Sequence, residues 1–207
     1  MVNVKVNYQM IIRAGEFITI GSDLAASGAV TTHGGNLSMC NGKQIYITKT
    51  GSQLGHLDAS DIIVVDWEAS AADETASMEL LVHRAMYHAL AQRLIDEQGE
   101  AFDEAAIVHA HALHTVFHSL KSESIQPVDS EGIFVLGDKI KVFWPEKTIA
   151  SDQVATLMAN AVLAGEKIAV IRGHGVFAIA DTLANAHRLV SCLEYSAQLL
   201  TLMQNAQ

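Results

Sequence analysis

Cysteine and proline are both scarce in this chain of 207 residues, which contains two of each. Cys40 and Cys192 are too few for a disulfide framework, so the sequence favours the reducing environment of the cytoplasm. The prolines, Pro127 and Pro145, form no linker, and the sequence has no low-complexity tract or internal repeat. We therefore expect residues 1–207 to form a single domain, which is large enough to bury a sizeable core.

Positive charge is also scarce, because 13 Lys and Arg face 23 Asp and Glu and leave a net charge of -10. Proteins that bind nucleic acid or anionic membranes need a basic face, so this balance argues against both partners. No apolar run approaches the length of a membrane span, and the sequence at Met1 lacks the pattern of a secretion signal. With 50% hydrophobic and 17% charged residues, the composition excludes a disordered chain.

Hydrophobic spacing and turn signals predict a mixed α/β fold. Helices are expected at residues 8–26, 77–94, 113–120, 151–164 and from 181 onward. Strands are expected at residues 37–40, 44–48, 62–65, 105–109, 133–136, 139–143 and 168–171. Two hairpins are predicted, one around Asn41-Gly42 and one around Gly137-Asp138. Hairpins interspersed with helices indicate a mixed or antiparallel sheet that is covered by helices.

Histidine, in contrast, is abundant, with ten residues in the chain. His109 and His111 lie two positions apart at the end of a predicted strand, so both side chains lie on one face and can converge on one metal ion. His174 lies between two glycines that follow a buried strand, which makes it the best candidate for a third ligand. Three protein ligands with one open position are typical of catalytic zinc.

The opposing interpretation is that these are ordinary histidines satisfied by hydrogen bonds. For His109-x-His111 alone the two interpretations weigh evenly, and the loop around His174 favours the metal. His114 and His118 also have ligand spacing, but Thr115 stands where the His-Glu-x-x-His motif of metalloproteases has its Glu. We therefore expect His114 and His118 to be structural or to support the ligands.

Glu79 is either a solvated residue at the edge of an apolar helix face or a partly buried acid/base, and local pattern alone favours the solvated residue. Asn36 and Thr50-Gly51 are turn residues at strand ends by one interpretation. By the other, they join the helix N-terminus near Ser77 in a neutral cradle for a phosphate. His83 follows Glu79 by one helical turn and could support the same site.

Taken in order, five segments resemble the class II aldolase/adducin family, and most of all its fuculose-1-phosphate aldolases. These segments are Gly35-Asn36-Leu37-Ser38, Thr48-Lys49-Thr50-Gly51, Ser77-Met78-Glu79, His109-Ala110-His111 and Gly173-His174-Gly175. The resemblance covers nearly the whole chain. It implies a three-layer αβα sandwich around a mostly antiparallel sheet, in a homotetramer with active sites at subunit interfaces.

Carried over by residue, the resemblance makes His109, His111 and His174 the ligands of one Zn²⁺ per subunit. Glu79 falls on the catalytic carboxylate, which can also close the fourth position of the metal, and this reverses the solvated interpretation. By the same resemblance, Asn36, Thr50, Gly51 and Ser77 fall on the positions that bind the substrate phosphate in the family. The implied activity is cleavage of a ketose 1-phosphate to dihydroxyacetone phosphate and a small aldehyde. In the implied mechanism zinc would act as Lewis acid and Glu79 would move a proton, with no Schiff-base lysine.

Three departures from the fuculose aldolases concern the substrate. Met78 replaces a second phosphate-binding serine, and Lys49 replaces a proline and offers the phosphate a positive charge. No tyrosine follows the His-x-His segment near Pro127, so the sequence assigns no proton donor to the aldehyde oxygen, and Glu131 is the candidate for that role.

Competing functions share parts of this pattern. Epimerases of the family carry Asp where this chain has Glu79, which favours an aldolase. Methylthioribulose-1-phosphate dehydratases and sugar-acid phosphate decarboxylases use the same three histidines and stay open as alternatives. A non-catalytic adducin-like interaction module would lack the zinc ligands. A purely structural zinc site would need neither Glu79 nor the phosphate loops.

Overall fold

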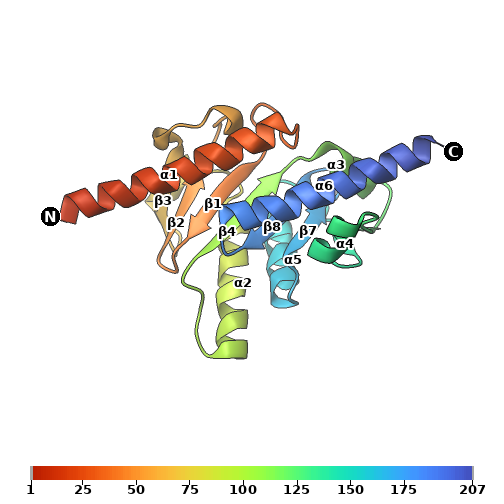
Figure 1. The fold of residues 1–207 in the computed structure, drawn as a ribbon. Helices are drawn as coiled ribbons and strands as arrows, with labels where there is room; N and C mark the ends of the chain where they lie inside the picture. Colours follow the sequence, from red (N-terminus) through yellow and green to blue (C-terminus); the bar gives the residue numbers. More distant parts are fainter. Residues whose placement is uncertain (1, 207) are drawn as a thin grey trace.

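The computed structural model describes residues 2–206. Its central sheet has eight strands in the order β3-β2-β1-β4-β8-β7-β6-β5 (Figure 1). The strands are β1 (Asn36–Cys40), β2 (Gln44–Thr48), β3 (Ile62–Asp66), β4 (Ala105–Ala110), β5 (Ser124–Ile125), β6 (Ile140–Phe143), β7 (Ile168–Ile171) and β8 (Gly175–Ala180). All neighbouring pairs are antiparallel except β6 and β7, which are parallel. The predicted mostly antiparallel sheet is therefore confirmed.

Helices cover both faces of the sheet and complete three layers. They are α1 (Val2–Ala26), α2 (Leu80–Gln98), α3 (Leu113–Ser119), α4 (Ser130–Leu136), α5 (Asp152–Leu163) and α6 (Leu183–Asn205). In Figure 1, α1 and α6 run across one face, whereas α2 and α5 stand behind the sheet. Two buried clusters fill the interfaces, one with residues of α1 and α6 and the other with residues of α2 and α5. The α/β sandwich expected from the sequence is confirmed.

Successive side chains of β4 point alternately to the two faces of the sheet, and this separates the two buried clusters. Val108 packs into the cluster of α1 and α6, whereas Ile107 packs into the cluster of α2 and α5. A strand has a side-chain period of two, so His109 lies on the same face as Ile107. Its neighbour across the β4–β8 ladder is Phe177, which belongs to the cluster of α2 and α5. The strand thus places His109 against that half of the core.

The hairpin predicted around Gly137-Asp138 is wrong. Residues Ser130–Leu136 form α4, whose first turn is capped by the Asp129 side chain, which accepts a hydrogen bond from the Gly132 nitrogen (2.8 Å). Strand β6 pairs instead with β5 and β7. A short apolar run such as Ile133–Leu136 fits a helix or a strand equally, and the N-cap just before the helix is the signal that distinguishes them.

Two smaller expectations also need correction, and one strand was not expected from the sequence. The first hairpin turns at Gly42-Lys43, because the register pairs Cys40 with Ile45, and Gly42 supplies the positive φ of 75°. The last helix begins at Leu183 with Thr182 as its cap, not at Asp181. Strand β8 was not predicted at all.

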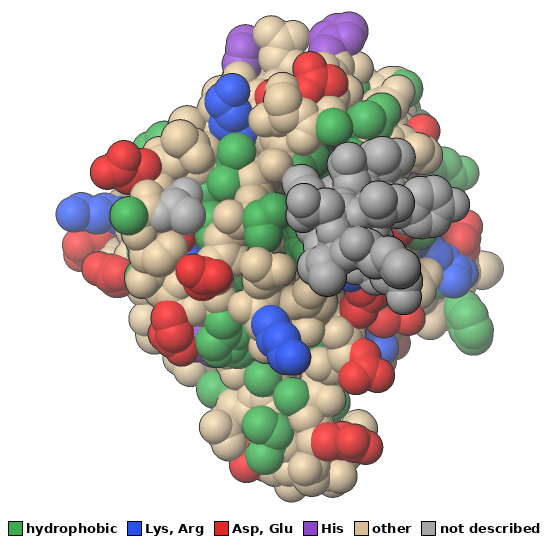
Figure 2. Space-filling view, turned by 90° about the vertical axis from the view of Figure 1, so that its left-hand side faces the viewer, with side chains coloured by type: hydrophobic (Ala, Val, Ile, Leu, Met, Phe, Trp, Pro, Cys, Tyr) green, Lys and Arg blue, Asp and Glu red, His purple; other side chains and the backbone are tan. Residues whose placement is uncertain are grey.

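The surface agrees with the acidic composition. On the part of the face that Figure 2 shows, Lys and Arg side chains stand singly and Asp and Glu side chains lie scattered among them. Among residues 2–206, no helix combines the length and the apolar character that a membrane span requires.

Candidate metal and substrate site

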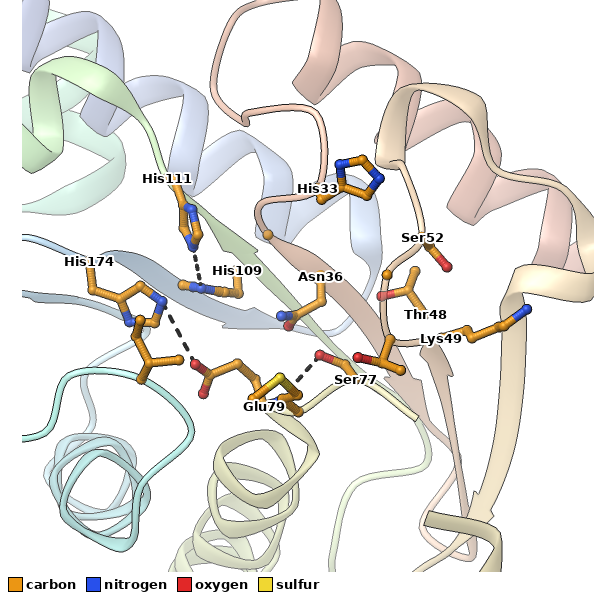
Figure 3. A pocket seen from close by; sticks show the side chains of 15 residues that line it. His33, Asn36, Thr48, Lys49, Ser52, Ser77, Glu79, His109, His111 and His174 are labelled. Atoms are coloured by element: carbon orange, nitrogen blue, oxygen red, sulfur yellow. Dashed lines mark hydrogen bonds and ion pairs between the residues drawn. The ribbon is translucent and has the colours of Figure 1, made fainter. Parts of the chain in front are cut away.

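A pocket of about 360 Å³ lies at the ends of the central strands and contains every site residue predicted from the sequence. From the ends of strands and the turn after β7 come Asn36, His109, His111 and His174, and from connecting loops come Thr50, Gly51, Ser77 and Glu79. Figure 3 shows the three histidine rings gathered at one side of this pocket, with Asn36 between them and Ser77. The sheet therefore brings together segments that are as many as 138 residues apart, from Asn36 to His174 (174 − 36).

Sheet register explains why the histidines meet. In the β1–β4 ladder Asn36 lies opposite His109, and β8 begins beside the end of β4 with the pair Ala110 and Val176. The turn between β7 and β8 carries His174 to the same edge. Gly175 permits this close approach, because a Cβ there would lie 2.3 Å from the Ala110 carbonyl oxygen. The histidines that the sequence predicted as a group thus occupy one corner of the pocket.

The three rings present nitrogen atoms to one another. One ligand atom from each of His109, His111 and His174 lies within 4.8 Å of the others, and the Nε2 atoms of His109 and His111 are 3.1 Å apart. His109 is fully buried, and its ring stacks on Phe177 with 3.9 Å between centroids. These three residues could hold a metal ion.

The protonation state of these three rings favours metal binding, because burial keeps the imidazoles neutral. The Nδ1–H of His109 donates to the Val176 carbonyl oxygen (3.0 Å), so its Nε2 carries the free lone pair toward the other rings. Burial, reinforced by its His neighbours, holds the pKa of His109 well below its usual value. Burial also lowers the pKa of His111, and it lowers that of His174 to about 4. Neutral imidazoles that converge from three sides fit a divalent metal such as zinc.

Glu79 lies beside the histidines and is only 4% exposed. Its Oε1 atom is 3.7 Å from His174 Nε2 and accepts a hydrogen bond from the Ala150 nitrogen (2.9 Å). The other oxygen, Oε2, is buried and has no hydrogen-bond partner among residues 2–206. Burial raises the pKa of Glu79, and the Ala150 N–H opposes that rise. A carboxyl with a raised pKa beside a metal site is suited to proton transfer near neutral pH.

The opposite side of the pocket is polar and largely neutral. The side chains of Asn36 and Ser77 are buried, and Asn36 Oδ1 has no hydrogen-bond partner within the described chain. Met78 and Lys49 also line this side, and Figure 3 shows Lys49 extending away from the histidine rings. Neutral donors and acceptors at the ends of strands are suited to a polar or anionic group.

His114 and His118 lie outside this cluster. His118 Nε2 is 3.1 Å from the Ala197 carbonyl oxygen, and both rings contact the Thr201 hydroxyl. They therefore join α3 to α6, in agreement with their expected structural role. Glu131 lies outside the pocket too, where it is exposed and 3.7 Å from Arg188.

His83 does not reach the pocket but supports it from the core. Its Nδ1 atom is 2.6 Å from the Ser38 hydroxyl, which is also 2.7 Å from the Tyr87 hydroxyl. The His83 ring meets the edge of Phe177, on which His109 stacks. All of these side chains are fully buried, so this polar network ties α2 to β1 directly behind the candidate ligands.

Several residues of the site were not found from the sequence. Val176 orients His109, and Ala150 and Ile149 approach Glu79 and the pocket from the loop before α5. Val176 and Ala150 act through backbone groups, and Ile149 is an ordinary apolar residue. None of the three has a side-chain pattern that a sequence could reveal.

Comparison with known proteins places this geometry in a family. Residues 15–201 match the family model described as class II aldolase and adducin N-terminal domain. The L-fuculose phosphate aldolase of Methanocaldococcus jannaschii is 28% identical over 187 residues, which cover 90% of this chain and 94% of that protein. A methylthioribulose-1-phosphate dehydratase of Acidiphilium cryptum is also 28% identical, over 88% of this chain and 87% of its own. The crystal structure of L-fuculose-1-phosphate aldolase from Thermus thermophilus aligns with a TM-score of 0.82 and 31% identity, covering 94% and 96% of the two chains.

Proposed function

The chain belongs to the class II aldolase and adducin family, and we propose that it is a zinc-dependent aldolase. Its substrate would be a ketose 1-phosphate similar to fuculose 1-phosphate, and its products dihydroxyacetone phosphate and a small aldehyde. The observation that carries this proposal is the convergence of three neutral histidine rings beside the buried carboxylate of Glu79. The similarity to L-fuculose phosphate aldolases supports it.

In this proposal His109, His111 and His174 hold one zinc ion per subunit, and Glu79 is close enough to contribute a fourth ligand when no substrate is bound. A bound zinc ion supplies Lewis-acid stabilisation of the negative charge that develops when the carbon–carbon bond of the ketose breaks. The hydrogen bond from His109 to Val176 keeps that ring oriented and its Nε2 free of a proton.

Glu79 is the proposed acid/base. After cleavage it would deliver a proton to the hydroxymethyl carbon of the dihydroxyacetone phosphate fragment, and in the reverse direction it would remove that proton. Its burial favours the protonated form, and the Ala150 N–H favours the ionised form. Both forms are needed in one catalytic cycle.

The phosphate is proposed to bind at the neutral side of the pocket, against Asn36, Thr50, Gly51 and Ser77. The unpartnered Oδ1 of Asn36 is part of an amide whose nitrogen can donate to an anion once the side chain adjusts. A phosphate held by neutral groups is compatible with a protein whose net charge is -10.

A second candidate is the dehydration of methylthioribulose 1-phosphate, because a dehydratase with that substrate in its name is 28% identical to this chain, the same identity as the aldolase of Methanocaldococcus jannaschii. A 3-oxo-tetronate 4-phosphate decarboxylase from Haemophilus influenzae is 26% identical, so decarboxylation belongs to the same group of alternatives. A sugar-phosphate epimerase is less consistent with Glu79, and a non-catalytic module is less consistent with the complete histidine cluster.

We further propose a single domain over residues 1–207 that acts in the cytoplasm as a homotetramer, without nucleic-acid or membrane partners. Large exposed hydrophobic side chains on α3, α4 and α6 support a contact between subunits, among them Leu113, Phe134 and Tyr195. Phe134 is 86% exposed, which is unusual for an aromatic side chain of a monomer.

The experiment that tests the proposed activity is a product assay. The zinc-loaded protein is incubated with a panel of ketose 1-phosphates that includes fuculose 1-phosphate and methylthioribulose 1-phosphate. We expect release of dihydroxyacetone phosphate from at least one of them at about one turnover per second or faster. The same protein dialysed against a chelator should release none. Loss of water or carbon dioxide, without dihydroxyacetone phosphate from any substrate, would contradict the aldolase assignment.

A further inference from the structure

Among the described residues, Ala150 is the only one other than glycine whose backbone has a positive φ angle. Its φ angle is 44°. This left-handed conformation is unfavourable for a residue with a Cβ atom. The nitrogen of the same residue donates the hydrogen bond to Glu79 Oε1 (2.9 Å). Unfavourable backbone and contact with the candidate acid/base therefore coincide in one peptide.

The segment around Ala150 is held in place from outside the pocket. The Ser151 hydroxyl donates to the Lys147 carbonyl oxygen (2.8 Å) and accepts from the Val154 nitrogen (3.2 Å) as the cap of α5. The Lys147 nitrogen donates to Gln153 Oε1 (3.2 Å). Both ends of the segment 147–151 are thus fixed on the start of α5. An unfavourable conformation persists where the surrounding structure imposes it, and such conformations gather at functional sites.

We infer that Ala150 is a positioning residue, whose left-handed backbone aims its N–H at Glu79 and holds that carboxylate beside His174. The inference rests on the proposed role of Glu79 as acid/base. An N–H that donates to an ionised oxygen forms a charge-assisted hydrogen bond, which restricts the rotation of the carboxylate. Without it, the side chain of Glu79 would have no hydrogen bond from the described residues to fix it beside His174.

Substitutions at Ala150 separate backbone conformation from side-chain size. Ala150→Gly and Ala150→Asn place residues that tolerate a positive φ, whereas Ala150→Val places a β-branched residue that does not. Asn and Val both add side-chain atoms beyond Cβ, so a loss in the Val variant alone points to backbone conformation rather than to added bulk. We expect Ala150→Val to lower kcat about tenfold or more with KM within about twofold, while the Gly and Asn variants retain most of kcat.

Thermal unfolding adds a readout that needs no substrate. Ala150→Gly should raise Tm by about 2–4 °C, because glycine removes the unfavourable conformation. If Val and Asn change kcat equally, or if Val lowers only Tm while kcat per folded chain is unchanged, Ala150 has no positioning role.

The hydrogen bond itself can be followed by NMR in protein labelled with ¹⁵N-alanine, where the Ala150 peak is assigned by its disappearance in Ala150→Gly. We expect its amide proton to lie downfield and to move upfield in Glu79→Gln, because the charge on the acceptor is lost. If the chemical shift of the Ala150 amide proton is the same in Glu79→Gln as in the unmodified protein, the inference is overturned. If the shift and the Tm change occur but no sugar phosphate is turned over, positioning by Ala150 holds and the proposed function fails.

Discussion

Replacing His109 with alanine is expected to leave the folded protein without its metal ion. His109 is fully buried, and its ring contacts both His111 and His174. Removing it leaves two imidazoles, and an affinity that depends on three converging ligands should fall by several orders of magnitude. Metal content measured by elemental analysis after gel filtration should drop from about one ion per chain to near zero.

Two further variants make this result specific. His114→Ala lies in the same stretch of sequence but outside the cluster, and it should keep its full metal content. His111→Ala removes a partly exposed ring, so it disturbs the core less than His109→Ala and should still lose the ion. A full metal complement in folded protein of both ligand variants would mean that the ion binds elsewhere.

Glu79→Gln is expected to retain the metal and to lose turnover by about a hundredfold or more, the usual contribution of an acid/base. Glutamine has the shape of glutamate, and its amide oxygen can still accept the hydrogen bond from Ala150. What it cannot do is move a proton. The measurement is kcat on the substrate identified in the product assay, with metal content determined on the same sample.

The matched control is Glu74→Gln, which makes the same chemical change on an exposed side chain five residues earlier. It should leave kcat unchanged. If Glu79→Gln keeps its metal and turns over within about threefold of the unmodified protein, Glu79 is not the acid/base.

The parts of the site that the sequence revealed are those encoded by local spacing. Two histidines at i and i+2 of an extended segment must share a face; His109 lies in β4, His111 follows directly after its end, and their Nε2 atoms are 3.1 Å apart. Likewise, the apolar spacing of α2 and the cap of α5 are local, and both helices formed as predicted within a few residues. Local rules held because tertiary packing reinforced them.

The burial of Glu79 is a feature that local sequence spacing does not predict. The local pattern just before α2 favours a solvated Glu79, and only the family resemblance reverses that interpretation. Its burial depends on the loop before α5, whose Ala150 is 71 residues further along the chain. Long-range contacts of this kind carry no signal in one sequence, because backbone donors look the same at every position.

The hairpin predicted over residues 130–143 is wrong for a different reason. Its apolar run is too short for periodicity to distinguish a helix from a strand, and Gly137 suited either a turn or a helix end. Strand β8 has no turn signal of its own to separate it from the Gly-His-Gly turn, which it follows directly, so local pattern does not reveal it. Yet β8 supplies both Phe177 and Val176, which stack on and orient His109.

The proposed aldolase mechanism requires proton transfer at dihydroxyacetone phosphate, which can be measured without knowing the sugar. The metal-loaded protein is incubated with dihydroxyacetone phosphate in D₂O, and the hydroxymethyl protons are followed by NMR. An aldolase that forms this fragment by cleavage must also remove its proton in reverse, so one of the two protons should exchange for deuterium. The chelator-treated protein and Glu79→Gln should leave both protons in place. If the metal-loaded protein also retains both protons, the proposed aldolase mechanism is contradicted.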